Sequence, residues 1–231
     1  MIYSAPLEPG ILLKRYKRFL ADVKLEDGTQ VTVHCPNSGS MLSCSNLGSS
    51  VYISKSSKAQ RKYPFTLEMT RHDSAWIGIN TSLTNSLVVE AIKNGDIREL
   101  RNPDSIQQEV KVSHESRLDV LLTKGVRKIF IEIKSCTLVV DQCAMFPDAV
   151  TSRGTRHLQE LARLVRQGQE GILFFLVQRM DAVFFRPAAH IDPVYAKTLA
   201  EVHRQGVQIL VYQAAVSPNG IRVAGSLPFS L

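Results

Sequence analysis

The stretch RLDVLLTKGVRKIFIEIKS, residues 117–135, contains two apolar runs that are joined by a glycine turn and interrupted by acids and a lysine. Its alternation of apolar and polar residues predicts a β-hairpin, in which successive side chains point to opposite faces of the sheet. The second strand should carry Ile129, Ile131 and Ile133 on one face, and Phe130, Glu132 and Lys134 on the other. Glu132 and Lys134 should therefore point the same way.

The first strand of this hairpin shows the same alternation. Its two faces should carry Leu118, Val120 and Leu122 on one side, and Arg117 and Asp119 on the other. If the two strands pair through the turn, Asp119 and Glu132 converge on one spot, with Lys134 beside them.

Two converging carboxylates supply the hard oxygen ligands that Mg²⁺ or Mn²⁺ prefers. A lysine beside the ion can orient an attacking water and stabilise the extra charge of a five-coordinate phosphate. Asp119 and Glu132 are thus the predicted metal ligands, and Lys134 completes a predicted catalytic trio for phosphodiester hydrolysis. The pattern by itself also suits charges that decorate the solvated face of a sheet and pair with one another.

The surrounding sequence indicates a mixed α/β domain. The expected elements are a helix at 81–95, strands at 109–113, 116–123 and 127–135, a helix at 153–168, a strand at 171–178, a helix at 192–206 and a strand at 207–216. A helix before the acidic hairpin and a basic helix after it follow the order in which the PD-(D/E)xK nuclease fold is built. On the basic helix, Arg153 and His157 are predicted to border the cleft, whereas Glu160 suits a surface salt-bridge network equally well.

The N-terminal part has a different pattern, with short strands and turns from about residue 19 to residue 65. A hairpin is expected through the Asp27-Gly28 turn, then a loop at 36–50 rich in Ser, Asn and Gly, and a further strand from Val51. These features are typical of a small OB-like β-barrel. The predicted fold class is therefore α+β, with an OB-like domain at 1–80 and a restriction-endonuclease-like α/β domain at 81–231.

A nucleic-acid partner is indicated by the net charge of +7 and by the segment KRYKRF at 14–19. Basic residues that alternate with aromatic rings combine phosphate contacts with base stacking. The predicted nucleic-acid-binding residues in this segment are Lys14, Arg15, Tyr16, Lys17 and Arg18, although a solvated edge strand would show the same composition. In the loop, Asn37 and Ser38 either cradle a phosphate with backbone N–H groups or form a tight turn held by side chains.

The apolar runs and the cysteine spacing of the chain indicate where the protein is located and whether its thiols are reduced. The chain of 231 residues starts without the apolar run of a signal peptide, and its longest apolar run, 172–177, is too short to span a bilayer. We therefore expect a cytoplasmic protein with no membrane partner; homo-oligomer formation stays open. The four cysteines form no CxxC pair and are expected to be reduced thiols. A zinc site at His34, Cys35 and Cys44 is the disfavoured alternative, because metal-binding pairs usually lie closer together.

Several long motifs in order resemble the sugar fermentation stimulation protein A family over essentially the whole chain. They are RYKRFLADVKLEDGTQVTVHCPNSGSM (15–41), NTSLTN (80–85), SRLDVLL (116–122), FIEIKSCTL (130–138), FPDAVTSRGTRHLQEL (146–161) and GVQILVY (206–212).

The resemblance implies an OB-fold-like barrel joined to a PD-(D/E)xK-like domain, in a DNA-binding protein linked to regulation of maltose metabolism. It also implies that Asp119, Glu132 and Lys134 are the nuclease-type triad. The fold often carries another acid on its first helix; here Glu90 is the one carboxylate in that segment, and it is a weak candidate beside Asn85. The alternatives are an active Mg²⁺-dependent nuclease, a DNA-binding regulator that does not cut, and a protein directed to RNA.

Overall fold

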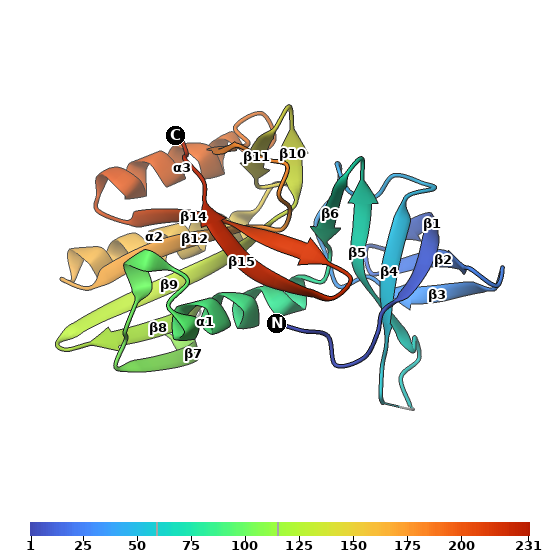
Figure 1. Cartoon of the computed structure of the whole chain (residues 1–231). Helices are drawn as coiled ribbons and strands as arrows, with labels where there is room; N and C mark the ends of the chain where they lie inside the picture. The colour runs from blue at the N-terminus through green and yellow to red at the C-terminus, as the bar shows by residue number, and fades with distance from the viewer. Residues whose placement is uncertain (59, 115) are drawn as a thin grey trace.

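The computed structural model describes residues 1–58, 60–114 and 116–231, which form a β-barrel beside a larger α/β domain (Figure 1). The barrel part consists of β1 (Glu8–Tyr16), β2 (Leu20–Leu25), β3 (Gln30–His34), β4 (Ser50–Lys55), β5 (Phe65–His72) and β6 (Ala75–Gly78). Its strand order is β3-β2-β1-β4-β5-β6, and a further β3–β5 pairing closes the first five strands into a barrel. The predicted OB-like architecture is confirmed.

The α/β domain begins with the short 3₁₀ helix η1. Its elements are η1 (Thr81–Leu83), α1 (Thr84–Asn94), η2 (Arg98–Leu100), β7 (Ser105–Lys111), β8 (Arg117–Lys124), β9 (Arg127–Cys136), β10 (Leu138–Val140), β11 (Cys143–Phe146), α2 (Ser152–Arg166), β12 (Glu170–Val177), β13 (Phe184–Pro187), α3 (Pro193–Arg204), β14 (Gln208–Ser217) and β15 (Gly220–Ser226). The helices and strands predicted after residue 79 are all present.

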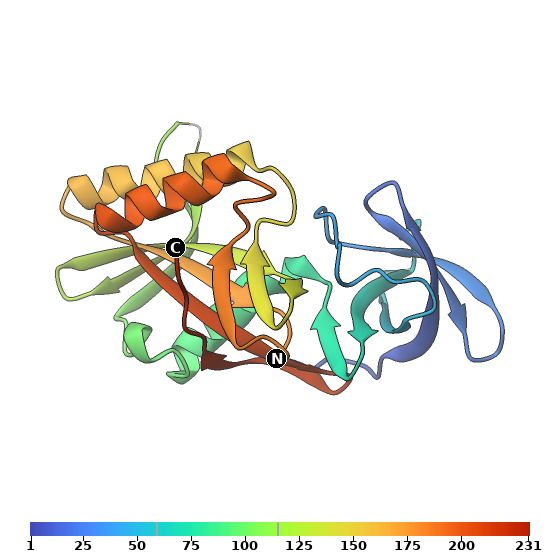
Figure 2. The same ribbon diagram turned by 90° about the horizontal axis from the view of Figure 1, so that it is seen from above.

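A mixed six-stranded sheet forms the centre of this domain, with the order β15-β14-β12-β9-β8-β7. Strand β12 runs parallel to both β9 and β14. Helix α1 covers one face of the sheet, and α2 and α3 lie side by side on the other (Figure 2). Because both faces are covered, β12 is almost entirely apolar and buried.

One alternative and one expectation from the sequence are wrong. The alternative of a solvated edge strand at 14–19 is wrong, because β1 lies between β2 and β4, ends at Tyr16, and is joined to β2 by a turn with left-handed Lys17 and Arg18. Leu118 does not share a face with Val120; it joins the core cluster under α2, whereas Val120 packs on the α1 side. The β8–β9 ladder ends at the Val120–Ile131 pair. Because the β8 residues before Val120 are not paired with β9, their side chains need not continue the alternation between the two faces of the sheet.

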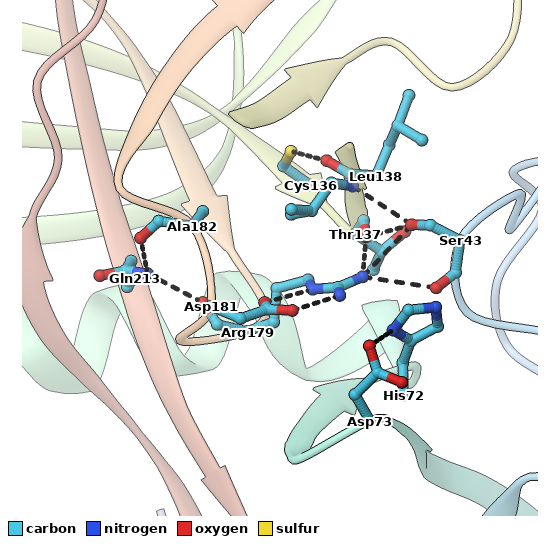
Figure 3. A network of polar contacts seen from close by, with 11 residues as sticks. Ser43, His72, Asp73, Cys136, Thr137, Leu138, Arg179, Asp181, Ala182 and Gln213 are labelled. Atoms are coloured by element: carbon cyan, nitrogen blue, oxygen red, sulfur yellow. Dashed lines mark hydrogen bonds and ion pairs between the residues drawn. The ribbon is translucent and has the colours of Figure 1, made fainter. Parts of the chain in front are cut away.

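The joint between the two parts centres on Arg179, which follows β12 and is 1% exposed (Figure 3). Its guanidinium binds the Asp181 carboxylate through two hydrogen bonds, of 2.6 Å from Nε and 2.5 Å from Nη2. Nη1 donates to the Ser43 hydroxyl of the barrel loop at 3.2 Å and to the Thr137 carbonyl at 3.3 Å. One buried cation therefore ties the barrel loop to the end of β9.

Candidate active site

The three predicted catalytic residues come together where β8 and β9 separate. Asp119 lies on β8 just beyond the last paired residues, and its carboxylate fills the opening between the strands. Oδ2 accepts the backbone N–H of Ile133 at 2.7 Å, and Oδ1 accepts Nδ2 of Asn85 at 2.8 Å. Asn85 thus fixes Asp119 from α1, whereas Glu90 forms an ion pair with the N-terminal ammonium and has no part in this site.

Glu132 on β9 is 2% exposed and has two unlike carboxylate oxygens. Oε1 accepts the Lys134 ammonium at 2.5 Å and is hydrogen-bonded to Nδ1 of His157. Oε2 is buried and has no hydrogen-bond partner among the residues that the structure describes. A buried carboxylate oxygen without a partner costs free energy unless an ion or a water binds it. This oxygen is therefore suited to coordinate a metal.

The two acids have opposite electrostatic environments. Burial, reinforced by the charge of Glu132, raises the pKa of Asp119 to about 6. Burial opposes ionisation of Glu132 too, but the hydrogen bond from His157 and the charge of Lys134 outweigh it and lower the pKa of Glu132. Both groups are therefore ionised at neutral pH, as metal ligands must be.

Helix α2 supplies the polar wall opposite Glu132. His157 is 6% exposed, and Arg153 donates from Nε to its Nε2 at 3.5 Å. This contact assigns the ring proton to Nδ1, which then donates to Glu132. The predicted neighbourhood of Arg153, His157 and Glu132 is present, with His157 rather than Arg153 in contact with the acid.

The residues of this site fit a magnesium ion. Mg²⁺ is usually held by one or two carboxylates, with water and substrate phosphate completing the octahedron. Asp119 and Glu132 provide those two carboxylates on adjacent strands, and Oε2 of Glu132 is free to bind. No group of three or more His, Cys, Asp or Glu side chains in metal-binding range occurs within residues 1–58, 60–114 and 116–231.

Comparison with known proteins decides the family. Residues 13–79 match the model described as the SfsA N-terminal OB domain, and residues 82–220 match the sugar fermentation stimulation protein RE domain. The chain belongs to the sugar fermentation stimulation protein family.

Full-length relatives support this assignment. The homolog from Desulfotalea psychrophila is 53% identical over 94% of this chain and 92% of the relative, and that from Pelobacter propionicus is 52% identical over 98% of both. Among solved structures, one described as Pyrococcus furiosus SfsA in complex with Ca²⁺ matches with a TM-score of 0.91 and 29% identity, over 100% of this chain and 98% of that one. Across the described residues, none of the helices has the length and apolar character needed to cross a membrane.

The basic segment of this family member is largely engaged within the barrel. Lys14 forms an ion pair with Asp22 at 3.3 Å, and its ammonium lies 5.1 Å from the centre of the Tyr16 ring. Tyr16 donates its hydroxyl proton to Asp22 at 3.0 Å. Arg15 donates to the carbonyls of Asn37 and Gly39 at 2.8 and 2.9 Å, so its guanidinium holds the loop. Lys17 and Arg18 stay exposed in their turn.

The loop at 36–50 docks on the α/β domain. Asn37 accepts the N–H of Gly39 at 2.9 Å, which is the tight turn that the sequence left as one alternative. Ser40 donates to the Asp148 carbonyl at 2.6 Å, and the Met41 N–H donates to the Asp148 carboxylate at 3.1 Å. A cavity of about 320 Å³ lies beside this loop. It is lined by three of the predicted nucleic-acid-binding residues, Arg18, Asn37 and Ser38, together with Thr81, Ser135 and Thr137.

The lining of this interdomain cavity includes Ser135, which directly follows Lys134 on β9. Sequence reasoning did not single out Ser135 or Thr137. Their only signal was proximity to Lys134 in the chain, because strand alternation places Ser135 on the opposite face. Tertiary docking of the loop brings both residues next to Arg18 and Ser38.

Replacing Gly39 with Ala is expected to destabilise the fold by about 1–3 kcal/mol, because overpacking a closely packed contact forces backbone and side chains to move. A Cβ at this position would lie 2.5 Å from Oδ2 of Asp148, which is held by the Met41 N–H. Urea unfolding of the two proteins measures the difference. A matched Gly225→Ala variant, where no atom lies within 4 Å of the added Cβ, should differ little. Equal stability of Gly39→Ala and wild type would contradict the docking.

Proposed function

We propose that this protein is a Mg²⁺-dependent nuclease, which hydrolyses phosphodiester bonds with Asp119 and Glu132 as metal ligands. DNA is the proposed substrate, in line with the basic charge of the chain and the OB barrel beside the site. The observation that carries the proposal is the free, buried Oε2 of Glu132 next to Asp119 and Lys134. The presence of Ca²⁺ in the complex named for the Pyrococcus furiosus relative supports a divalent-cation site in this fold.

The chain's own residues have separate parts in this chemistry. Bound Mg²⁺ would supply Lewis-acid activation of the phosphate and lower the pKa of the attacking water. Asn85 and the Ile133 N–H hold the Asp119 carboxylate at the opening between the strands. His157 holds Oε1 of Glu132 and so directs Oε2 to the free side. Lys134, 15% exposed at its side chain, can orient the attacking water and stabilise the developing negative charge.

The test is cleavage of labelled single-stranded DNA, duplex DNA and RNA by wild type and by Asp119→Asn, each with Mg²⁺, Mn²⁺ or EDTA. The variant should lose at least about 10²-fold in cleavage rate, because a neutral amide is a weaker ligand for a hard cation and a weaker source of transition-state stabilisation. Calorimetry should show weaker Mg²⁺ binding. Asp141→Asn, in the exposed β10–β11 turn, is the control and should cut at the wild-type rate. Equal cutting by wild type and Asp119→Asn would rule the proposal out.

The second candidate is a DNA-binding regulator that does not cut. It is favoured by one contact, the Lys134–Glu132 ion pair of 2.5 Å, which satisfies half of the acid without any metal. In this form the protein would act in the cytoplasm on DNA, in line with the proposed link of the family to maltose metabolism. Metal-independent DNA binding together with no cleavage of any substrate would favour it over the nuclease.

A further inference from the structure

A second cavity, of about 420 Å³, is lined in part by His157, the residue that is hydrogen-bonded to Glu132. Two elements that are distant in sequence form it: the turn end of the β7–β8 hairpin and the first turns of α2. The hairpin contributes Lys111, His114 and Arg117, and the helix contributes Arg153, Arg156 and His157. The volume falls in the range of small-ligand sites, which begins at roughly 300 Å³.

Among the residues that the structure describes, the lining has an excess of positive charge: it contains the cations Lys111, Arg117, Arg153 and Arg156 and one carboxylate, that of Glu109. The ion pairs formed by the described residues involve none of these four cations. Because charged side chains usually find a counter-charge when a suitable one is in reach, these groups are available to an anion from outside.

The fold places these cations in mutually repulsive pairs. Lys111 lies directly opposite Arg117 in the antiparallel β7–β8 ladder, where like charges destabilise the pairing. Arg153 and Arg156 are three residues apart on α2 and so occupy neighbouring positions on its surface, where like charges also repel. Charge repulsion thus destabilises both the β7–β8 hairpin and α2, and one anion bound between them would relieve it.

His157 connects this cavity to the catalytic trio. Its ring forms part of the cavity wall and is hydrogen-bonded to Glu132 through Nδ1. An anion in the cavity would therefore lie one side chain away from the proposed metal ligand. Where the scissile phosphate lies at Glu132, a second phosphate of the same strand is the anion that a nucleic acid would present here.

We propose that this cavity is a phosphate subsite, which binds a phosphate group of the nucleic-acid strand adjacent to the scissile bond. The subsite rests on the proposed nuclease function, because it takes the phosphate of the same substrate. The chemistry suits either a terminal phosphate monoester or an internal phosphodiester, since arginine and lysine bind both.

Binding by fluorescence anisotropy tests the subsite, with Ca²⁺ replacing Mg²⁺ and two oligothymidylates that differ only in a 5′-phosphate or a 5′-hydroxyl. The Arg117→Gln/Arg156→Gln double variant should bind about tenfold more weakly, with a salt dependence reduced by about one unit of slope, because one phosphate contact is lost. A Lys128→Gln/Arg204→Gln control removes two exposed charges outside the cavity and should bind like wild type. Circular dichroism checks that both variants fold.

The outcomes distinguish a terminal from an internal phosphate, and they test the subsite independently of the nuclease proposal. A loss confined to the 5′-phosphorylated strand assigns a terminal phosphate, and an equal loss on both strands assigns an internal one. If the double variant binds like the control, or if wild type binds neither strand, the subsite is wrong. Because the readout is binding, a protein that never cuts but loses affinity in the double variant would keep the subsite and refute the nuclease.

Discussion

Replacing Lys134 with Gln is expected to slow metal-dependent cleavage by about 10²–10³-fold while leaving Mg²⁺ affinity unchanged or higher. The ammonium lies 2.5 Å from Oε1 of Glu132, beside the free oxygen that we assign to the metal. A cation so close to a metal site repels the metal, so its removal cannot weaken binding through charge. Its loss does remove the group that would orient the attacking water and stabilise the developing negative charge.

Single-turnover cleavage and isothermal calorimetry measure these two quantities separately. Lys128→Gln is the matched control, because it removes an exposed lysine from the other end of the same strand and should change neither. The contrast with Asp119→Asn is the informative comparison: that variant should lose metal affinity and rate together. If Lys134→Gln lost metal affinity without slowing the step at saturating Mg²⁺, the lysine would have a structural role in holding Glu132 and not a chemical one.

The sequence was sufficient to place the acids of this site. Alternation along 127–135 put Glu132 and Lys134 on one face of β9, and the structure joins them in an ion pair. For Asp119 the expected proximity was correct, but the reasoning from strand alternation was incomplete. Its carboxylate reaches the backbone of β9 because the ladder ends at Val120, and the end of a ladder depends on tertiary context.

The long-range contacts of the basic residues could not be predicted from local patterns. Arg15 resembled a phosphate-binding residue because basic and aromatic residues alternate around it, yet its donors reach carbonyls more than 20 residues away in sequence. The pairing of Lys111 with Arg117 depends on the hairpin register, and their approach to α2 depends on the packing of that helix. Such arrangements follow from long-range packing, which composition and period do not encode.

Replacing Arg179 with Met is expected to destabilise the protein by about 3 kcal/mol, because removing one partner of a buried ion pair leaves the other groups unpaired. The substitution keeps an apolar stem in a position that is 1% exposed. It leaves the Asp181 carboxylate without its two guanidinium hydrogen bonds, and it takes the same donor from the Ser43 hydroxyl and the Thr137 carbonyl. Asp181 is 34% exposed at its side chain, so water relieves part of this cost.

Urea unfolding at neutral pH measures the loss of stability. The control is Arg166→Met, which removes an exposed arginine bonded only to Gln205 among the described residues. Its free energy of unfolding should stay within about 0.5 kcal/mol of wild type.

The pH dependence of the stability difference identifies the contribution of the ion pair. Burial opposes ionisation of Asp181, but its hydrogen bonds and ion pair with Arg179 outweigh this and lower its pKa. The pair therefore stabilises wild type above the ordinary pKa of aspartate, and its contribution disappears as the pH falls through the lowered value. The difference between wild type and Arg179→Met should narrow in acid. A difference that stays constant down to the acid transition would instead assign the loss to packing and to the barrel-loop contacts.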